Sequence, residues 1–197
     1  PATRDLWFQY QLVIIGDVSA AAFGDNELLW LNQFVRFNGG GMIFIDGRME
    51  SYGTFRGTPI EGLLPVKPAV LGLSELRSTG TRLRFPKNLG ACDSLKLDDD
   101  PVVNLRIWND LPGPRWVAIT EALPATETLL EVVDGETVLP GLVRGRPGAG
   151  RVLYSAFDES WRWRLNVGDI HHQQYWNQLA KGIMEPPFSV QAVSYTH

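Results

Sequence analysis

The stretch from residue 11 to residue 47 decides the fold: it opens with "QLVIIGDVS" (11–19) and closes with "GMIFIDG" (41–47). Both segments are short, continuous apolar runs, which are typical of strands buried on both faces of a parallel sheet. Between them, "GDNELLWLNQFVRFNGGG" (24–41) has apolar residues at helical spacing and glycines that end the helix. Strand, helix and strand at this spacing predict a parallel pair with a right-handed crossover.

A second ordered region lies near the end of the chain. The segment 127–157 reads "ETLLEVVDGETVLPGLVRGRPGAGRVLYSAF". Asp134-Gly135 is a strong hairpin signal, and "RPGAG" (146–150) makes a second turn, so three antiparallel strands are predicted in a meander. A last helix is predicted within 168–184. The glycine- and proline-rich segment 48–115 gives no clear strand pattern.

Composition narrows the class of protein. The chain has 197 residues, 44% of them hydrophobic, and a formal net charge of −4. We therefore expect one globular domain over 1–184, followed by a tail or linker at 185–197, and no binding to nucleic acid. A lone cysteine, Cys92, excludes an internal disulfide. No apolar run approaches the roughly 18 residues of a membrane span, so no membrane insertion by this segment is expected.

The chain begins "PATRDLW", without a methionine, and enters a strand almost at once. We interpret it as a segment of a longer polypeptide, whose targeting signals would lie elsewhere. The compartment is therefore left open, and the parent protein could be anchored in a membrane.

Five segments of the chain form a recognisable pattern: "LVIIGDVS" (12–19), "GGG" (39–41), "MIFIDG" (42–47), "GTPIEGLLPV" (57–66) and "GRVLYSAFDESWRWR" (150–164). Together they resemble the class I glutamine-amidotransferase-like domains, in particular an uncharacterised branch found in large bacterial proteins with von Willebrand A-type segments and membrane helices. The resemblance implies an α/β, flavodoxin-like sandwich with a mostly parallel central sheet, from which the first βα unit of the family would be missing.

The same resemblance implies that the family's catalytic residues are absent. Active members place a cysteine on a sharp turn after a strand and a histidine with a glutamate after a later strand. Here Asp46 stands at the first position, and "YSAFDES" (154–160) carries no histidine. We therefore expect no glutamine hydrolysis by the family mechanism and no cofactor.

Three carboxylates follow the strongest strands: Asp17, Asp46 and Asp158. Ligands of open α/β sheets bind at the carboxyl ends of the strands, so these side chains could line one crevice and hold Mg²⁺ or Ca²⁺. Equally, aspartates after strands cap helices and close turns. We favour the second interpretation and predict no metal site, and keep Asp46 and Asp158 as candidates for a carboxylate-based or metal-dependent hydrolase.

The segment "DESWRWRLN" (158–166) admits two interpretations. In an extended conformation Trp161 and Trp163 would share one side, and Arg162 and Arg164 the other. The arginines could clamp an anion, or the whole segment could fasten the last strand and helix to the sheet, with buried tryptophans and paired arginines. We favour the fastening role.

A binding pocket, if present, is expected at the loop "GRMESYGTFRG" (47–57), because loops at strand ends carry binding residues. Its predicted residues are Asp17, Arg48, Glu50, Tyr52, Glu159 and Arg162.

The expected function is that of a non-catalytic binding or interaction module in a larger bacterial protein. Its partners would be other domains of that protein, a separate protein, or a small-molecule or sugar ligand. The alternatives are the hydrolase based on Asp46 and Asp158 and a carbohydrate-binding domain that uses exposed tryptophans.

Overall fold

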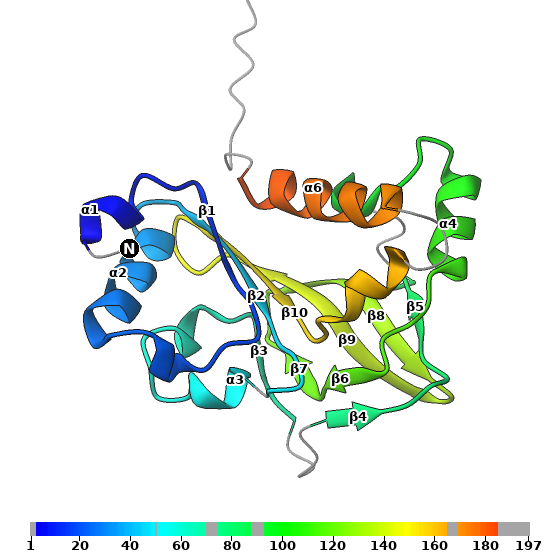
Figure 1. Ribbon diagram of the computed structural model, residues 1–197, viewed down its shortest axis with the longest axis horizontal. Helices are drawn as coiled ribbons and strands as arrows, with labels where there is room; N and C mark the ends of the chain where they lie inside the picture. The colour runs from blue at the N-terminus through cyan, green and yellow to red at the C-terminus, as the bar shows by residue number, and fades with distance from the viewer. Residues whose placement is uncertain (1–2, 50, 70–74, 88–92, 165–168, 185–197) are drawn as a thin grey trace, which may run out of the picture.

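The computed structural model describes residues 3–49, 51–69, 75–87, 93–164 and 169–184. Six strands form the main sheet, and Figure 1 shows them running side by side across the centre of the domain. In spatial order they are β1 (Leu12–Ile15), β2 (Gly41–Ile45), β10 (Arg151–Ser155), β9 (Thr137–Gly145), β8 (Glu127–Asp134) and β5 (Arg82–Arg84).

One half of this sheet is parallel. β1 pairs with β2, and β2 pairs with β10, both in parallel register. Helix α2 (Asp25–Arg36) connects β1 to β2, which confirms the predicted strand–helix–strand unit. The side chains of Met42, Ile43 and Phe44 in β2 are fully buried, as expected of a central strand covered on both faces.

The other half is antiparallel. β10, β9 and β8 form the predicted meander, and β5 adds a further antiparallel neighbour. The prediction of a mostly parallel sheet is therefore not confirmed, because two of these five pairings are parallel and three are antiparallel. The reason is local: tight turns allow only antiparallel neighbours, and Gly135 has the positive φ of 57° that the β8–β9 hairpin requires.

Two short strand pairs accompany the main sheet: β3 (Val66–Pro68) pairs with β7 (Thr120–Ala122), and β4 (Glu75–Arg77) with β6 (Trp116–Ala118). The remaining α-helices are α1 (Arg4–Trp7), α3 (Ser51–Thr54), α4 (Pro101–Asp110) and α6 (Ile170–Met184). Short 3₁₀ segments are η1 (Ala20–Ala22), η2 (Glu61–Leu63), η3 (Asp93–Leu95) and η4 (Glu159–Trp163).

Helices and short strands cover the main sheet from both sides (Figure 1). In Figure 1, α6 runs above the sheet, where it contacts β1, β2 and β10, whereas α3 and β4 lie below it. The result is a layered α/β domain with one hydrophobic core. Among the described residues, no helix is long and apolar enough to cross a membrane. The predicted tail at 185–197 lies outside the described residues.

Candidate functional site

The carboxyl ends of β1, β2 and β10 meet at one edge of the sheet because these three strands are parallel. The sequence places Asp17, Asp46 and Asp158 just beyond these ends. The negative charge of Asp17 acts on both of the other two carboxyls. The structure therefore gathers the three predicted aspartates at one edge, but it gives them different surroundings.

Asp46 is buried, with 2% of its surface exposed, and it is bonded to the domain itself. Its Oδ1 accepts hydrogen bonds from the Ser51 hydroxyl and the Tyr52 backbone N–H, both at 3.2 Å. Its Oδ2 accepts from the Tyr154 hydroxyl at 2.9 Å. Burial raises the pKa of Asp46 above its usual value, although these three hydrogen bonds oppose the shift. Asp46 thus fastens β2, α3 and β10 together.

Asp17 and Asp158 are less fully bonded. Asp17 Oδ2 accepts from the Met49 backbone N–H at 2.8 Å. Asp17 Oδ1 and Asp158 Oδ1 are both buried and have no hydrogen-bond partner among the described residues. Burial, and then the negative charges of Asp17 and Glu159, raise the pKa of Asp158, whereas a hydrogen bond from the backbone and, to a smaller extent, Arg48 lower it. No group of three or more His, Cys, Asp or Glu side chains within the described ranges is arranged to hold a metal ion.

Of the loop residues predicted to form the walls of a pocket, one lies at the protein surface and one is buried in the core. Arg48 is exposed. Tyr52 is not a wall: it is buried, its hydroxyl points to the Val66 carbonyl, and burial raises its pKa to about 12. The residue belongs to the short helix α3, which turns its side chain into the core. Glu50 lies outside the described residues.

Glu159 fastens η4 to the segment before β6. Its carboxylate is buried and accepts hydrogen bonds from the backbone N–H groups of Arg115 and Trp116. Arg48 lies 3.7 Å away and Arg162 4.0 Å away, so two cations face this acid. Removal of a buried carboxylate bonded in this way would leave donors unsatisfied, which is costly.

The side chains of Arg162 and Trp163 extend the same connection. Arg162 donates to the Gly113 carbonyl at 2.7 Å, and Trp163 Nε1 donates to the Pro112 carbonyl at 3.1 Å. The Trp163 ring also packs edge-on against Trp108 and Tyr175, on α4 and α6. This arrangement supports the fastening role of the segment 158–166.

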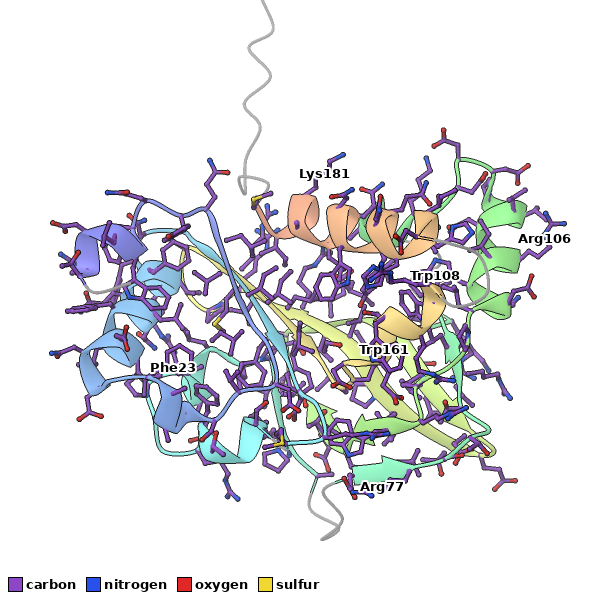
Figure 2. All side chains as sticks on the ribbon, in the orientation of Figure 1. Phe23, Arg77, Arg106, Trp108, Trp161 and Lys181 are labelled. Carbon is purple, nitrogen blue, oxygen red and sulfur yellow. The ribbon has the colours of Figure 1, made fainter. Side chains whose placement is uncertain are left out.

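The predicted period-two alternation of this segment is wrong. Residues 159–163 form a 3₁₀ helix, in which residues two apart point in different directions. Consequently Trp163 is 1% exposed, whereas Trp161 is 53% exposed. Figure 2 labels Trp161 beside η4 and Trp108 nearer to α4 and α6.

Two adjoining hollows lie beside η4. The first, of about 370 Å³, is lined by Arg48, Arg115, Asp158, Glu159, Trp161 and Arg162. The second, of about 560 Å³, is lined by Arg48, Arg77, Ser78, Thr79, Arg115 and Trp116. We call them the Trp161 hollow and the Ser78 hollow, and they share Arg48 and Arg115. Asp46 lines neither of them.

Ten residues line the two hollows, and four of them are candidate site residues named from the sequence. Arg48, Asp158, Glu159 and Arg162 were predicted from strand ends and from the unusual segment 158–166. Arg77 and Arg115 were missed because their neighbours, "RSTG" (77–80) and "PGPRW" (112–116), resemble ordinary turns. Only the pairing of β4 with β6 brings these two segments together.

Comparison with known proteins shows the fold but no family. No protein-family model and no curated protein matches the sequence. A cytoplasmic protein from Salmonella typhimurium has a similar structure, with a TM-score of 0.67, 16% identity, and coverage of 93% of this chain and 75% of that chain. A second cytoplasmic protein, from Salmonella typhimurium LT2, gives a TM-score of 0.68 at 17% identity, with 94% and 76% covered.

A β-galactosidase from Rahnella sp. R3 is similar over a smaller part of its length. The TM-score is 0.51 at 15% identity, and the match covers 90% of this chain but 23% of the enzyme. At such identities the likeness concerns the fold alone.

Proposed function

We propose that this chain is a non-catalytic binding or interaction module of the class I glutamine-amidotransferase-like type, working within a larger bacterial protein. In this proposal the parallel half of the sheet, β1, β2 and β10, corresponds to part of a flavodoxin-like sheet. The crossover helix α2 between β1 and β2 supports that correspondence.

The observation that carries the proposal is the bonding of Asp46. This residue occupies the turn where the family's nucleophile would stand, yet both of its carboxylate oxygens accept hydrogen bonds from the domain. A reacting group must be able to reach a bound substrate. Asp46 is buried and lines neither hollow, so it is suited to hold the turn rather than to react.

No histidine stands in the segment 156–164 after β10, where the family's base would be expected. After β10 the chain carries Asp158 and Glu159 in place of a histidine and a glutamate. Glu159 is occupied by two backbone N–H groups. The two histidines of the last helix, His171 and His172, lie on α6, and Trp176 donates to His172 at 3.2 Å.

The alternative of a carboxylate-based hydrolase is less well supported. Such an enzyme needs both candidate acids at one cleft. Asp158 lines the Trp161 hollow and Asp46 does not. The carbohydrate-binding alternative, in contrast, gains support from one specific observation: Trp161 combines 53% exposure with a place in the wall of a hollow.

The proposal is tested by measuring ammonia release from glutamine by the full chain, alongside Asp46→Asn and a heat-denatured sample. We expect ammonia release equal to that of the denatured sample. Turnover by the wild type that Asp46→Asn abolishes would overturn the proposal and identify Asp46 as a reacting group. Turnover that persists in Asp46→Asn would also overturn it and place the reaction elsewhere.

A further inference from the structure

Four arginines line the two hollows, although the chain as a whole has a formal net charge of −4. Its four arginines are Arg48, Arg77, Arg115 and Arg162. They come from separate parts of the sequence, so the cluster is a product of the fold. Guanidinium groups bind carboxylates and phosphates with planar, directed hydrogen bonds.

These arginines differ in how far the protein already satisfies them. Arg77 pairs with Glu75 at 2.6 Å, and Arg162 donates to the Gly113 carbonyl. Arg48 is 67% exposed and lies 3.7 Å from Glu159, a long distance for an ion pair. The Arg115 guanidinium is exposed and has no hydrogen-bond or ion-pair partner among the described residues. Arg48 and Arg115, which both hollows share, are therefore available to an added anion.

The Trp161 hollow also contains an exposed aromatic surface. An indole ring is a flat apolar surface, and burial of such a ring under a ligand removes apolar area from water. The volume of about 370 Å³ lies within the range of small-molecule sites, about 300–1,000 Å³. A site with an aromatic wall and a few directed polar groups is typical of specific ligand binding.

Two carboxylates in the same wall restrict the charge of the ligand. Asp158 and Glu159 line the Trp161 hollow together with Arg48, Arg115 and Arg162. Carboxylates accept hydrogen bonds from hydroxyl groups but repel a second anionic group placed beside them. The wall thus favours a ligand with one anionic group, several hydroxyls and an apolar ring face.

We propose that the Trp161 hollow binds an anionic monosaccharide unit, whose ring stacks on Trp161 and whose phosphate or carboxylate contacts Arg115 and Arg48. The Asp158 and Glu159 side chains face its hydroxyls. The hydroxyls of Ser78 and Thr79, in the adjoining Ser78 hollow, extend the polar wall. This inference rests on the proposed function and names the ligand class of that same site.

Calorimetric titration of the full chain with five compounds tests the ligand class: glucose 6-phosphate, galacturonate, glucose, inorganic phosphate and adenosine monophosphate. We expect one or both anionic sugars to bind at least about tenfold more tightly than glucose and phosphate. Preference for glucose 6-phosphate identifies a sugar phosphate as the source of the anion, and preference for galacturonate identifies an acidic sugar. Equal binding of glucose, tighter binding of adenosine monophosphate, or no binding by either anionic sugar would overturn the inference.

Variants locate the site. We expect Trp161→Ala and Arg115→Gln each to weaken binding of the preferred sugar by about tenfold or more. The matched controls are Phe37→Ala, an exposed aromatic that lines neither hollow, and Arg106→Gln on α4, which Figure 2 places away from Trp161. Unchanged affinity in Trp161→Ala or in Arg115→Gln would overturn the inference.

The two proposals fail separately. Absence of sugar binding without any glutamine turnover removes the ligand class and leaves a non-catalytic interaction module. Glutamine turnover that depends on Asp46 removes the proposed function, whether or not a sugar binds.

Discussion

The Tyr154 hydroxyl on β10 donates a hydrogen bond of 2.9 Å to Asp46 Oδ2, just beyond the end of the neighbouring strand β2. Both residues are buried, Tyr154 completely. The bond joins β10, the strand that precedes the segment 158–166, to the turn that follows β2. One buried hydrogen bond therefore connects β10 to Asp46, one of the two candidate acids of the sequence analysis.

Tyr154→Phe should destabilise the protein, although the substitution removes only the hydroxyl and keeps the aromatic ring. Tyr154→Phe removes one of three donors to a buried carboxylate, and we expect a loss of about 1–3 kcal/mol in the free energy of unfolding. Since this bond holds the pKa of Asp46 down, the variant should also raise that pKa further. Urea unfolding gives the first quantity and carboxyl NMR titration the second. Unchanged stability would show that Asp46 does not depend on Tyr154.

Asp158 should reduce stability at neutral pH. Its folded-state pKa is raised above the unfolded value, so the native state binds more protons in the interval between them, and stability falls as pH rises through that interval. Asp158→Asn removes the charge, and we expect it to be more stable than the wild type at pH 7 by at most about 1 kcal/mol, because water screens this partly exposed group.

The same variant has an internal control in its pH dependence. The advantage of Asp158→Asn should disappear below the unfolded-state pKa, near about pH 4, where the wild-type carboxyl is protonated in both states. Urea unfolding at both pH values measures this. A variant that is less stable than the wild type at pH 7 would show that the carboxylate makes a stabilising contact.

Position 47 requires glycine because the side chain of Asp17 occupies the space that a Cβ would need. A Cβ at position 47 would lie 2.6 Å from Asp17 Cγ, so we expect Gly47→Ala to cost about 1–3 kcal/mol. In an Asp17→Gly background the same change should cost distinctly less, since the obstructing side chain is absent, including its Cβ, which lies 2.8 Å from the added Cβ. The control is Gly53→Ala in α3, where no atom lies within 4 Å and alanine favours the helix. Denaturant unfolding of the four variants forms the test, and equal costs of Gly47→Ala in both backgrounds would refute the close contact.

The two tryptophans of "ESWRW" (159–163) should behave differently. Trp163 is 1% exposed and packs against Trp108 and Tyr175, so Trp163→Ala should cost about 3–5 kcal/mol. Trp161 is 53% exposed, and Trp161→Ala should change stability by no more than about 0.5 kcal/mol. Thermal or urea unfolding separates the two roles, and similar losses in both variants would contradict the assignment.

The sequence predicted those parts of the fold that depend on short-range patterns. The strand–helix–strand unit and the β8–β9–β10 meander follow from continuous apolar runs and from Asp134-Gly135. The order of the main sheet was beyond such patterns, because the pairing of β5 with β8 involves a three-residue strand in the glycine- and proline-rich middle of the chain. The expectation of a mostly parallel sheet came from the family resemblance. The sheet has instead more antiparallel than parallel pairings.

For the candidate site, too, short-range patterns were informative and contacts between remote segments could not be predicted. The sequence left open whether Asp17, Asp46 and Asp158 line one crevice, and the favoured interpretation was that they cap helices and close turns. The structure gathers all three at one edge of the sheet. Their different environments depend on partners remote in sequence, such as Tyr154 for Asp46. The place of Arg115 and Arg77 beside Arg48 depends on the pairing of β4 with β6, for which neither segment carries a signal.

Urea unfolding of the wild type and Asp46→Ala at pH 7 shows most directly whether Asp46 belongs to the fold or to a reaction, with Asp46→Asn as the matched variant that keeps an acceptor oxygen. Alanine leaves the donors of Ser51, Tyr52 and Tyr154 without their acceptor, so a loss of at least about 2 kcal/mol is predicted, with a smaller loss for asparagine. Acids assembled for catalysis commonly reduce stability, and their removal increases it. An Asp46→Ala variant as stable as the wild type, or more stable, would contradict the structural role of Asp46 and return it to the list of catalytic candidates.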